Sequence, residues 1–180
     1  QRANFFRDIC AALPDHTAYF SPAAQGVLWR DDEAIPSQWG LATFVRKSIP
    51  IIAHAQGFVH KTFSPKGYGE HPRSRTAHAV RLHDFDTARA VCLTHMHGLR
   101  DLRGKMDTPE RAAQVRRLLS LSKSISEAGD AAIICGDFNV EPESETLTYL
   151  RQRGFEELVL ARGYTSTRTT LYEKPAKFAD

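Results

Sequence analysis

A short apolar run with two isoleucines spans residues 131–135, and Gly136 closes it. Such a run predicts a buried strand, and the glycine marks the point at which the strand ends. Asp137 and Asn139 follow, with Phe138 between them. Because side chains alternate along an extended chain, the acid and the amide lie on one side and the phenyl ring on the other. The segment therefore predicts a sheet strand that ends in a polar pair above an apolar plug.

The pattern Gly-Asp-x-Asn has two interpretations. In the first, Asp137 activates a water molecule or holds a hard cation, while Asn139 hydrogen-bonds the same oxyanion. In the second, the pattern is an ordinary exit from a strand into a turn, because Asp and Asn side chains cap turns. Spacing alone favours the second interpretation, and only another segment with the same layout changes the balance.

Residues 90–98 have that layout. They form an apolar strand candidate that ends in polar groups and in Gly98. His95 and His97 lie two residues apart, so on a strand they share a face. If both strands lie in one sheet and end at the same edge, their polar ends meet where open α/β sheets bind ligands.

The clearest helix signal lies between these two segments and runs from Pro109 to about Ala128. Thr108 suits the N-cap, proline suits the first turn, and Gly129 suits the end of the helix. Strand–strand–helix–strand–helix is the order expected of an α/β sandwich. The other predicted elements are helices at 4–13 and 143–153, strands at 27–29, 41–46, 51–60, 76–83 and 89–95, and a loop at 64–74.

The two strand-end motifs read Thr94-His95-Met96-His97-Gly98 and Ile134-Cys135-Gly136-Asp137-Phe138-Asn139. Together they resemble the endonuclease/exonuclease/phosphatase superfamily, a group of magnesium-dependent phosphodiesterases and phosphatases that includes the pancreatic-type deoxyribonucleases and the abasic-site nucleases. Residues 40–47 resemble the early central strand of that family, and the helix at 111–119 supports the likeness. The resemblance implies an α/β fold of deoxyribonuclease type, a layered sandwich of two mixed, largely antiparallel β-sheets flanked by helices.

The resemblance also implies that residues 1–180 are a single domain, incomplete because it lacks its first and last strands. Family members carry their main magnesium ligand, a Glu, in an early Gln-Glu pair, and a catalytic His in a final Ser-Asp-His box. Neither motif occurs in this sequence. Asp180 matches the family Asp that orients the catalytic His. The chain is therefore expected to be a fragment, or the ordered part of a longer protein, and such a fragment need not be active alone.

The same resemblance implies residue roles. Asp137 matches the Asp that orients or deprotonates the attacking water, and Asn139 matches the Asn that binds the scissile phosphate and stabilises its charge. His95 matches a His that contacts the phosphate, which completes an implied catalytic set with Asp180. The implied cofactor is Mg²⁺ or Mn²⁺, which polarises the phosphoryl oxygen and contacts this chain only at Asp137 and Asn139. The implied function is a metal-dependent hydrolase of phosphate esters, foremost a phosphodiesterase or nuclease.

Basic residues cluster near the same strands. Arg73 and Arg75 lead into one predicted strand, and Arg100, Arg103 and Lys105 follow the His-Met-His segment. A loop with three cations beside a hydrolytic edge would bind and steer an anionic substrate, such as a nucleic acid or another phosphate ester. A solvated loop explains the same cluster equally well, and the net charge of +3 suits a phosphate-bearing partner only mildly.

Composition sets the broad class. Hydrophobic residues make up 42% and charged residues 25% of the chain, which is ordinary for a packed core. No apolar stretch reaches the ~18 residues that span a bilayer, so no membrane partner is expected. The chain is expected to be a monomer. Cys10, Cys92 and Cys135 are odd in number and form no CxxC pair, which favours reduced core thiols and a cytoplasmic setting. A signal peptide is not decided by this sequence, because the amino end looks missing.

Other side chains that could carry chemistry are expected to be structural. Trp29 and Trp39 fit a core better than a base-stacking platform, and Arg111 and Gln114 fit anchors of the long helix. His97 shares a face with His95 but matches no role in the family.

Two rival functions stand beside the hydrolase. The tripeptide 95–97 begins like the His-x-His-x-Asp-His box of dizinc metallo-β-lactamase-type hydrolases, but Leu99 and Arg100 stand where that box needs Asp and His. The other rival is a catalytically inactive phosphate- or protein-binding member of the same fold, and the joint presence of all four catalytic matches argues against it. The natural substrate stays open among DNA, RNA, lipids and small phosphoesters, because loops set function within a fold.

Overall fold

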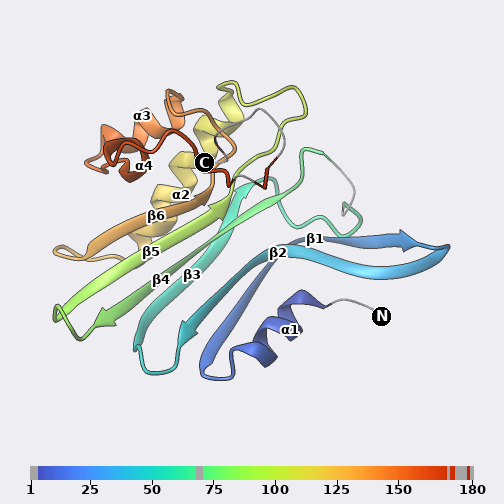
Figure 1. Ribbon diagram of the computed structural model, residues 1–180, viewed down its shortest axis with the longest axis horizontal. Helices are drawn as coiled ribbons and strands as arrows, with labels where there is room; N and C mark the ends of the chain where they lie inside the picture. The colour runs from blue at the N-terminus through green and yellow to red at the C-terminus, as the bar shows by residue number, and fades with distance from the viewer. Residues whose placement is uncertain (1–3, 68–70, 170, 173–177, 179–180) are drawn as a thin grey trace.

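The computed structural model describes residues 4–67, 71–169, 171–172 and 178 (Figure 1). Two sheets face each other, and helices lie outside them. The elements follow in the order α1 (Phe5–Ala12), β1 (His16–Arg30), β2 (Glu33–Arg46), β3 (Ile51–His60), β4 (Arg75–Asp84), β5 (Arg89–His97), α2 (Pro109–Ile125), β6 (Ala131–Asp137), α3 (Glu145–Arg151) and α4 (Leu158–Ala161).

The larger sheet has the strand order β3–β4–β5–β6, and the smaller sheet is the hairpin β1–β2. Among these strands, pairing is antiparallel except between β5 and β6, which run parallel. α2 packs on one face of the larger sheet with α3 beside it, the hairpin packs on the opposite face, and α1 lies against the hairpin (Figure 1). The predicted sandwich of largely antiparallel sheets flanked by helices is confirmed.

The hairpin is much longer than the sequence predicts. The strands predicted at 27–29 and 41–46 are parts of β1 and β2, which pair along their whole length with a bulge after Pro22. Asp31 and Asp32 close the turn with φ of 48° and 64°, the two left-handed residues that a tight hairpin turn requires. Cross-strand pairing therefore extends both strands beyond what local β-propensity predicts.

The remaining elements lie close to their predicted positions, although α4 has no counterpart among the predicted helices. None of the helices within the described ranges combines the length and apolar character needed to cross a membrane. The strands predicted at 51–60, 76–83 and 89–95 match β3, β4 and β5. The helices predicted at 4–13 and 143–153 match α1 and α3, although α3 is shorter than predicted. The loop predicted at 64–74 has no helix or strand among its described residues.

α2 begins where its sequence predicts and ends a turn earlier. The side chain of Thr108 caps the helix by accepting the backbone N–H of Arg111, and Pro109 occupies the first turn. The main apolar core lies between α2 and the larger sheet, and Phe138 belongs to it, as predicted for an apolar plug. The buried members of this core are Val59, Ala77, Met96, Val115, Leu118, Phe138, Val140 and Leu150.

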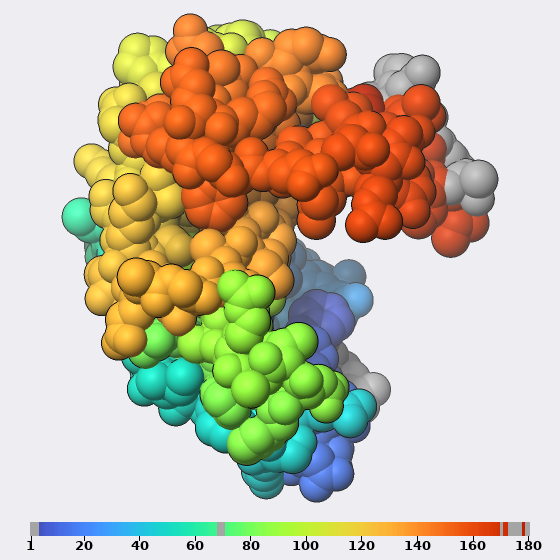
Figure 2. Space-filling view, turned by 90° about the vertical axis from the view of Figure 1, so that its left-hand side faces the viewer, coloured from blue at the N-terminus to red at the C-terminus, as the bar shows by residue number. Residues whose placement is uncertain are grey.

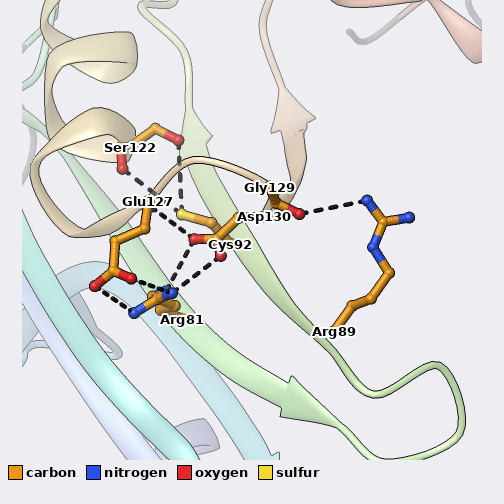
Figure 3. Close-up of polar contacts among 7 residues, drawn as sticks. All are labelled: Arg81, Arg89, Cys92, Ser122, Glu127, Gly129 and Asp130. Atoms are coloured by element: carbon orange, nitrogen blue, oxygen red, sulfur yellow. Dashed lines mark hydrogen bonds and ion pairs between the residues drawn. The ribbon is translucent and has the colours of Figure 1, made fainter.

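An arginine on β4 fastens the segment that connects α2 to β6 (Figure 3). The guanidinium of Arg81 donates to the carboxylates of Glu127 and Asp130 over 2.9–3.0 Å. Arg89, at the start of β5, donates to the carbonyl of Gly129 over 3.3 Å. Because this segment leads directly into β6, these contacts fix the point at which β6 starts beside β5.

Two glycines let the ends of β5 and β6 approach each other. A Cβ on Gly136 would lie 2.1 Å from the carbonyl oxygen of Met96, and a Cβ on Gly98 would lie 2.1 Å from that of Phe138. Gly136 also has a φ of +129°, which residues with side chains rarely adopt. Both strand ends therefore need glycine where they meet.

Gly136→Ala is expected to lower the free energy of unfolding by about 2–4 kcal/mol, because the variant combines a strained φ with a backbone clash. Urea-induced unfolding measures the loss. Gly57→Ala is the matched control, since it adds the same methyl group to β3, where the new Cβ would make an ordinary contact of 3.8 Å with Cδ1 of Leu121. Equal stabilities of the two variants would contradict the prediction.

Candidate active site

A cluster of polar side chains lies between the two sheets. Thr43 of β2 places its Oγ1 2.6 Å from Nδ1 of His78 and 2.7 Å from Nε2 of His95. Tyr19 of β1 packs its ring on His54 and His78, with centroid distances of 4.6 and 5.3 Å. The hairpin therefore holds a row of histidines that crosses the larger sheet from β3 to β5.

The parallel pairing of β5 and β6 brings the two predicted strand ends together. His95 pairs with Cys135 and His97 pairs with Asp137, so these side chains project from the face that the hairpin covers in part. Nε2 of His97 lies 4.0 Å from Oδ2 of Asp137. The immediate neighbour of Asp137 is thus His97, to which the sequence assigns no role. His95 lies two residues further back along β5, bonded to Thr43.

Asn139 forms a tight turn at the end of β6. Its φ is +54°, and its backbone N–H donates to Oδ1 of Asp137 over 3.0 Å. Its side-chain Nδ2 donates to the carbonyl of Gly98 over 3.2 Å, which joins the turn to the end of β5. One carboxylate oxygen of Asp137 therefore caps the turn, while the other lies on the side of His97.

A tryptophan and two arginines lie beside this pair. The guanidinium carbons of Arg75 and Arg73 lie 4.6 and 5.7 Å from the ring centroid of Trp39, and that ring packs on His97 at 5.4 Å. Arg75 is only 2% exposed, and its Nε and Nη1 have no hydrogen-bond partner among the residues that the structure describes. Burying a charge costs several kcal/mol unless another charge compensates it. An anion bound here would supply that compensation.

The charges around His97 and Asp137 act in opposite directions. Burial first, and then the charges of Arg73 and Arg100, lower the pKa of Arg75 to about 10, although the charge of Asp137 opposes them. Burial also lowers the pKa of His97, with Arg75 and Arg100 adding to the effect and Asp137 opposing it. His97 is therefore neutral at pH 7, beside a carboxylate and within the electrostatic reach of three guanidinium groups.

The three cations predicted to bind substrate have different surroundings. Arg100 is exposed, and its charge reaches the His97–Asp137 pair. Arg103 forms an ion pair with Asp101 at 2.7 Å. Lys105 donates to the carbonyl of Phe178. The structure thus brings Arg100 to the candidate site and gives the other two cations partners elsewhere in the loop and the C-terminal segment.

The loop that carries these cations is held by α2. The buried side chain of Arg111 donates to the carbonyls of Leu99, Gly104 and Met106. Gln114 accepts the backbone N–H of Leu99 over 3.0 Å. The prediction that Arg111 and Gln114 are structural anchors is confirmed.

The described residues offer only part of a metal site. In this part of the chain, no group of three or more His, Cys, Asp or Glu side chains could hold a metal ion, so the ligand set of a dizinc centre is not assembled. Asp137 and Asn139 supply oxygen donors of the kind that Mg²⁺ prefers, and this ion commonly takes its other ligands from water and substrate phosphates. The donor chemistry of these two residues therefore suits a divalent cation. Asp180, the remaining predicted catalytic residue, lies outside the described residues.

The inner face of β6 is open. Ile133 is 46% exposed there, and Cys135 is exposed too, so the prediction of a buried core thiol is wrong at this position and correct for Cys92. The cause is that the hairpin contacts β4 and β5 but leaves the edge strand uncovered. Figure 2 shows the molecule hollowed on this side, between the segment that follows α3 (orange-red) and the β4–β5 turn (green).

No sequence profile of a known family and no curated protein matches the chain. Solved structures match its fold. One is an endonuclease/exonuclease/phosphatase family protein from Bacteroides thetaiotaomicron, with a TM-score of 0.57 and 17% identity over 83% of this chain and 50% of that one. Another is the mannosyl-6-phosphatase from the same species, with a TM-score of 0.57 and 17% identity over 83% and 52%.

A third similar structure is the catalytic domain of human Nocturnin with a bound sulfate anion, with a TM-score of 0.55 and 20% identity over 84% of this chain and 52% of that one. The chain therefore has the fold of endonuclease/exonuclease/phosphatase proteins, as its motifs imply. It spans about half the length of the structures that it matches.

Two substitutions are expected to move the pKa of His97 in opposite directions. Arg75→Met removes a charge that lowers this pKa, so the pKa rises; Asp137→Asn removes the charge that raises it, so the pKa falls. Titration of the His97 ring protons by NMR measures both shifts. Arg116→Met, on the exposed side of α2, is the control and leaves the pKa unchanged. Shifts of the same sign in the two site variants would show that the charges are placed wrongly.

His78 is expected to make stability depend on pH. Burial first, then His95 and His54, lower its pKa from 6.5 to about 4 in the folded chain. Between these two pKa values the unfolded chain binds a proton that the folded chain does not. The contribution of His78 to the free energy of unfolding is therefore fully present above pH 6.5, and it is lost toward pH 4 by up to about 1.4 kcal/mol per pH unit. Urea unfolding between pH 7 and 4.5 measures the slope. His78→Gln should flatten it by one proton, and an unchanged slope would refute the assignment.

Proposed function

We propose that this chain carries the phosphate-binding and water-activating residues of a phosphoester hydrolase that uses a divalent metal ion, with phosphodiesters as the expected substrates. The observation that carries the proposal is the Asp137 carboxylate, whose Oδ1 accepts the N–H of Asn139 and whose charge acts on the buried guanidinium of Arg75, two nitrogens of which have no hydrogen-bond partner among the described residues. The fold supports the proposal, because the similar structures include a mannosyl-6-phosphatase and a catalytic domain with a bound sulfate anion.

In this mechanism Asp137 orients the attacking water and accepts its proton. Oδ1 accepts the backbone N–H of Asn139, so Oδ2 is the oxygen that acts as the base, and neutral His97 lies 4.0 Å from it. Two groups can bind phosphate oxygens. One is the second N–H of the Asn139 side-chain amide, and the other is Nδ1 of His95, because its Nε2 is already bonded to Thr43.

The charge that develops on the phosphate needs stabilisation from fixed groups. Arg75 and Arg100 provide it at this edge of the sheet, and the burial of Arg75 strengthens the effect of its charge. Asp137 and Asn139 would hold a bound divalent ion, preferably Mg²⁺, and this ion would polarise the phosphoryl oxygen.

A phosphate-binding protein without catalysis is the second candidate. The observation that favours it is that the described residues alone do not assemble a complete metal-binding group. Asp137 would then serve as the turn cap seen in its bond to Asn139, and the arginines would provide the affinity for an anion.

The first test is hydrolysis of bis(p-nitrophenyl) phosphate by the protein. We expect turnover with Mg²⁺ or Mn²⁺, none with EDTA, and a rate roughly 10²–10⁴-fold lower in Asp137→Ala, because the general base is lost. Asp86→Ala is the matched control, since it removes an exposed carboxylate at the β4–β5 turn and should leave the rate unchanged.

The outcomes separate the two candidates. Metal-dependent turnover that survives in Asp137→Ala would remove this residue from the mechanism. Binding of inorganic phosphate without turnover of any phosphate ester would favour the binding protein instead.

A further inference from the structure

The hydroxyl of Thr43 bridges two histidine rings from neighbouring strands. Its Oγ1 lies 2.6 Å from Nδ1 of His78 on β4 and 2.7 Å from Nε2 of His95 on β5. The two histidines pair directly across the strands, with ring centroids 6.1 Å apart. Both contacts have the length of good hydrogen bonds, so each needs one hydrogen between its oxygen and its nitrogen.

The number of hydrogens in this bridge is fixed. A threonine hydroxyl has one hydrogen, and a neutral imidazole carries one N–H and one bare nitrogen. Burial lowers the pKa of both rings, and His95 and His54 help to lower that of His78 to about 4, so both rings are neutral at pH 7. Thr43 therefore donates to one histidine and accepts from the other, which leaves two arrangements.

His78 decides between the two arrangements. It is 2% exposed, and its Nε2 has no hydrogen-bond partner within the described part of the chain. If Nε2 carried the proton, the structure would bury an N–H donor without an acceptor, and such orphaned donors are rarer than under-satisfied acceptors. The proton of His78 is therefore on Nδ1, from which it is donated to Thr43. Thr43 in turn donates to Nε2 of His95, and the proton of His95 is on Nδ1.

We propose that Thr43 is a positioning residue that fixes His95 as the neutral Nδ1–H tautomer, so that Nδ1–H donates to a phosphate oxygen of the substrate. The role of the phosphate rests on the proposed function, whereas the tautomer rests on the bridge alone. The opposite tautomer would present a lone pair to a negatively charged oxygen. His95 is only partly buried, which leaves its second nitrogen able to meet a ligand.

The tautomers are measured at pH 7.5 by long-range ¹H–¹⁵N correlation NMR of the protein with ¹⁵N-labelled histidines. The signals of the two rings are assigned by their disappearance in His78→Gln and in His95→Gln. Wild type should show the Nδ1–H tautomer for both rings. Thr43→Val should release His95 from that state, and Thr43→Ser should restore it, because serine supplies the same hydroxyl. The Nε2–H tautomer of His95 in wild type would overturn the proposal. So would an unchanged tautomer in Thr43→Val; if that variant fails to fold, wild type and Thr43→Ser decide.

Binding of inorganic phosphate is a separate measurement. We expect Thr43→Val to bind it about tenfold more weakly than wild type and Thr43→Ser to bind it equally well, because one hydrogen bond to a charged ligand is lost and regained. Equal affinities in all three proteins would overturn the role of Nδ1–H in phosphate binding. No binding by wild type would instead count against the proposed function, and the NMR result on the tautomer would stand independently.

Discussion

The parallel pairing of β5 with β6 is the contact on which the rest of this structure depends. Parallel neighbours need a long crossover, and α2 supplies it while it buries its apolar face on the larger sheet. The register of this pair sets His97 beside Asp137. Gly98 and Gly136 allow the strand ends to touch, and the contacts of Arg81 hold the entry to β6. A shift of one residue would turn Asp137 to the helix side of the sheet.

The two faces of the larger sheet differ in character, and the difference explains how one sheet is both stable and reactive. The helix side is apolar and close-packed around Met96 and Leu118. The hairpin side carries His78 and His95, whose rings form hydrogen bonds with Thr43 of the hairpin. Because these rings are partly or fully removed from water, they stay neutral and can act as oriented donors and acceptors. The hairpin thus contributes to the candidate site although none of the predicted site residues lies on it.

Local signals were sufficient for much of the fold. The cap at Thr108, the apolar plug at Phe138 and the strand ends around His95 and Asp137 depend on neighbouring residues only, so their sequence patterns predict them. The length of the hairpin depends on pairing between distant residues and was underestimated. The position of His97 at the end of a predicted strand indicates a site residue, but only the register of β5 and β6 shows that it faces Asp137. No sequence pattern indicates that Trp39 belongs to the site, because a tryptophan alone does not show which side chains stack on it.

The sequence by itself determined the type of fold, the strand ends at which polar side chains emerge, and the identity of the acid and the amide that follow Gly136. Alternation and capping act over a few residues, and for that reason they can be read from a chain. Only the tertiary structure decided that Asp137 faces His97, that Arg75 is buried against Trp39 without a hydrogen-bond partner for two of its nitrogens in the described chain, and that Thr43 joins two histidines. These contacts depend on sheet register and on the packing of one sheet against another, which no short stretch of sequence contains.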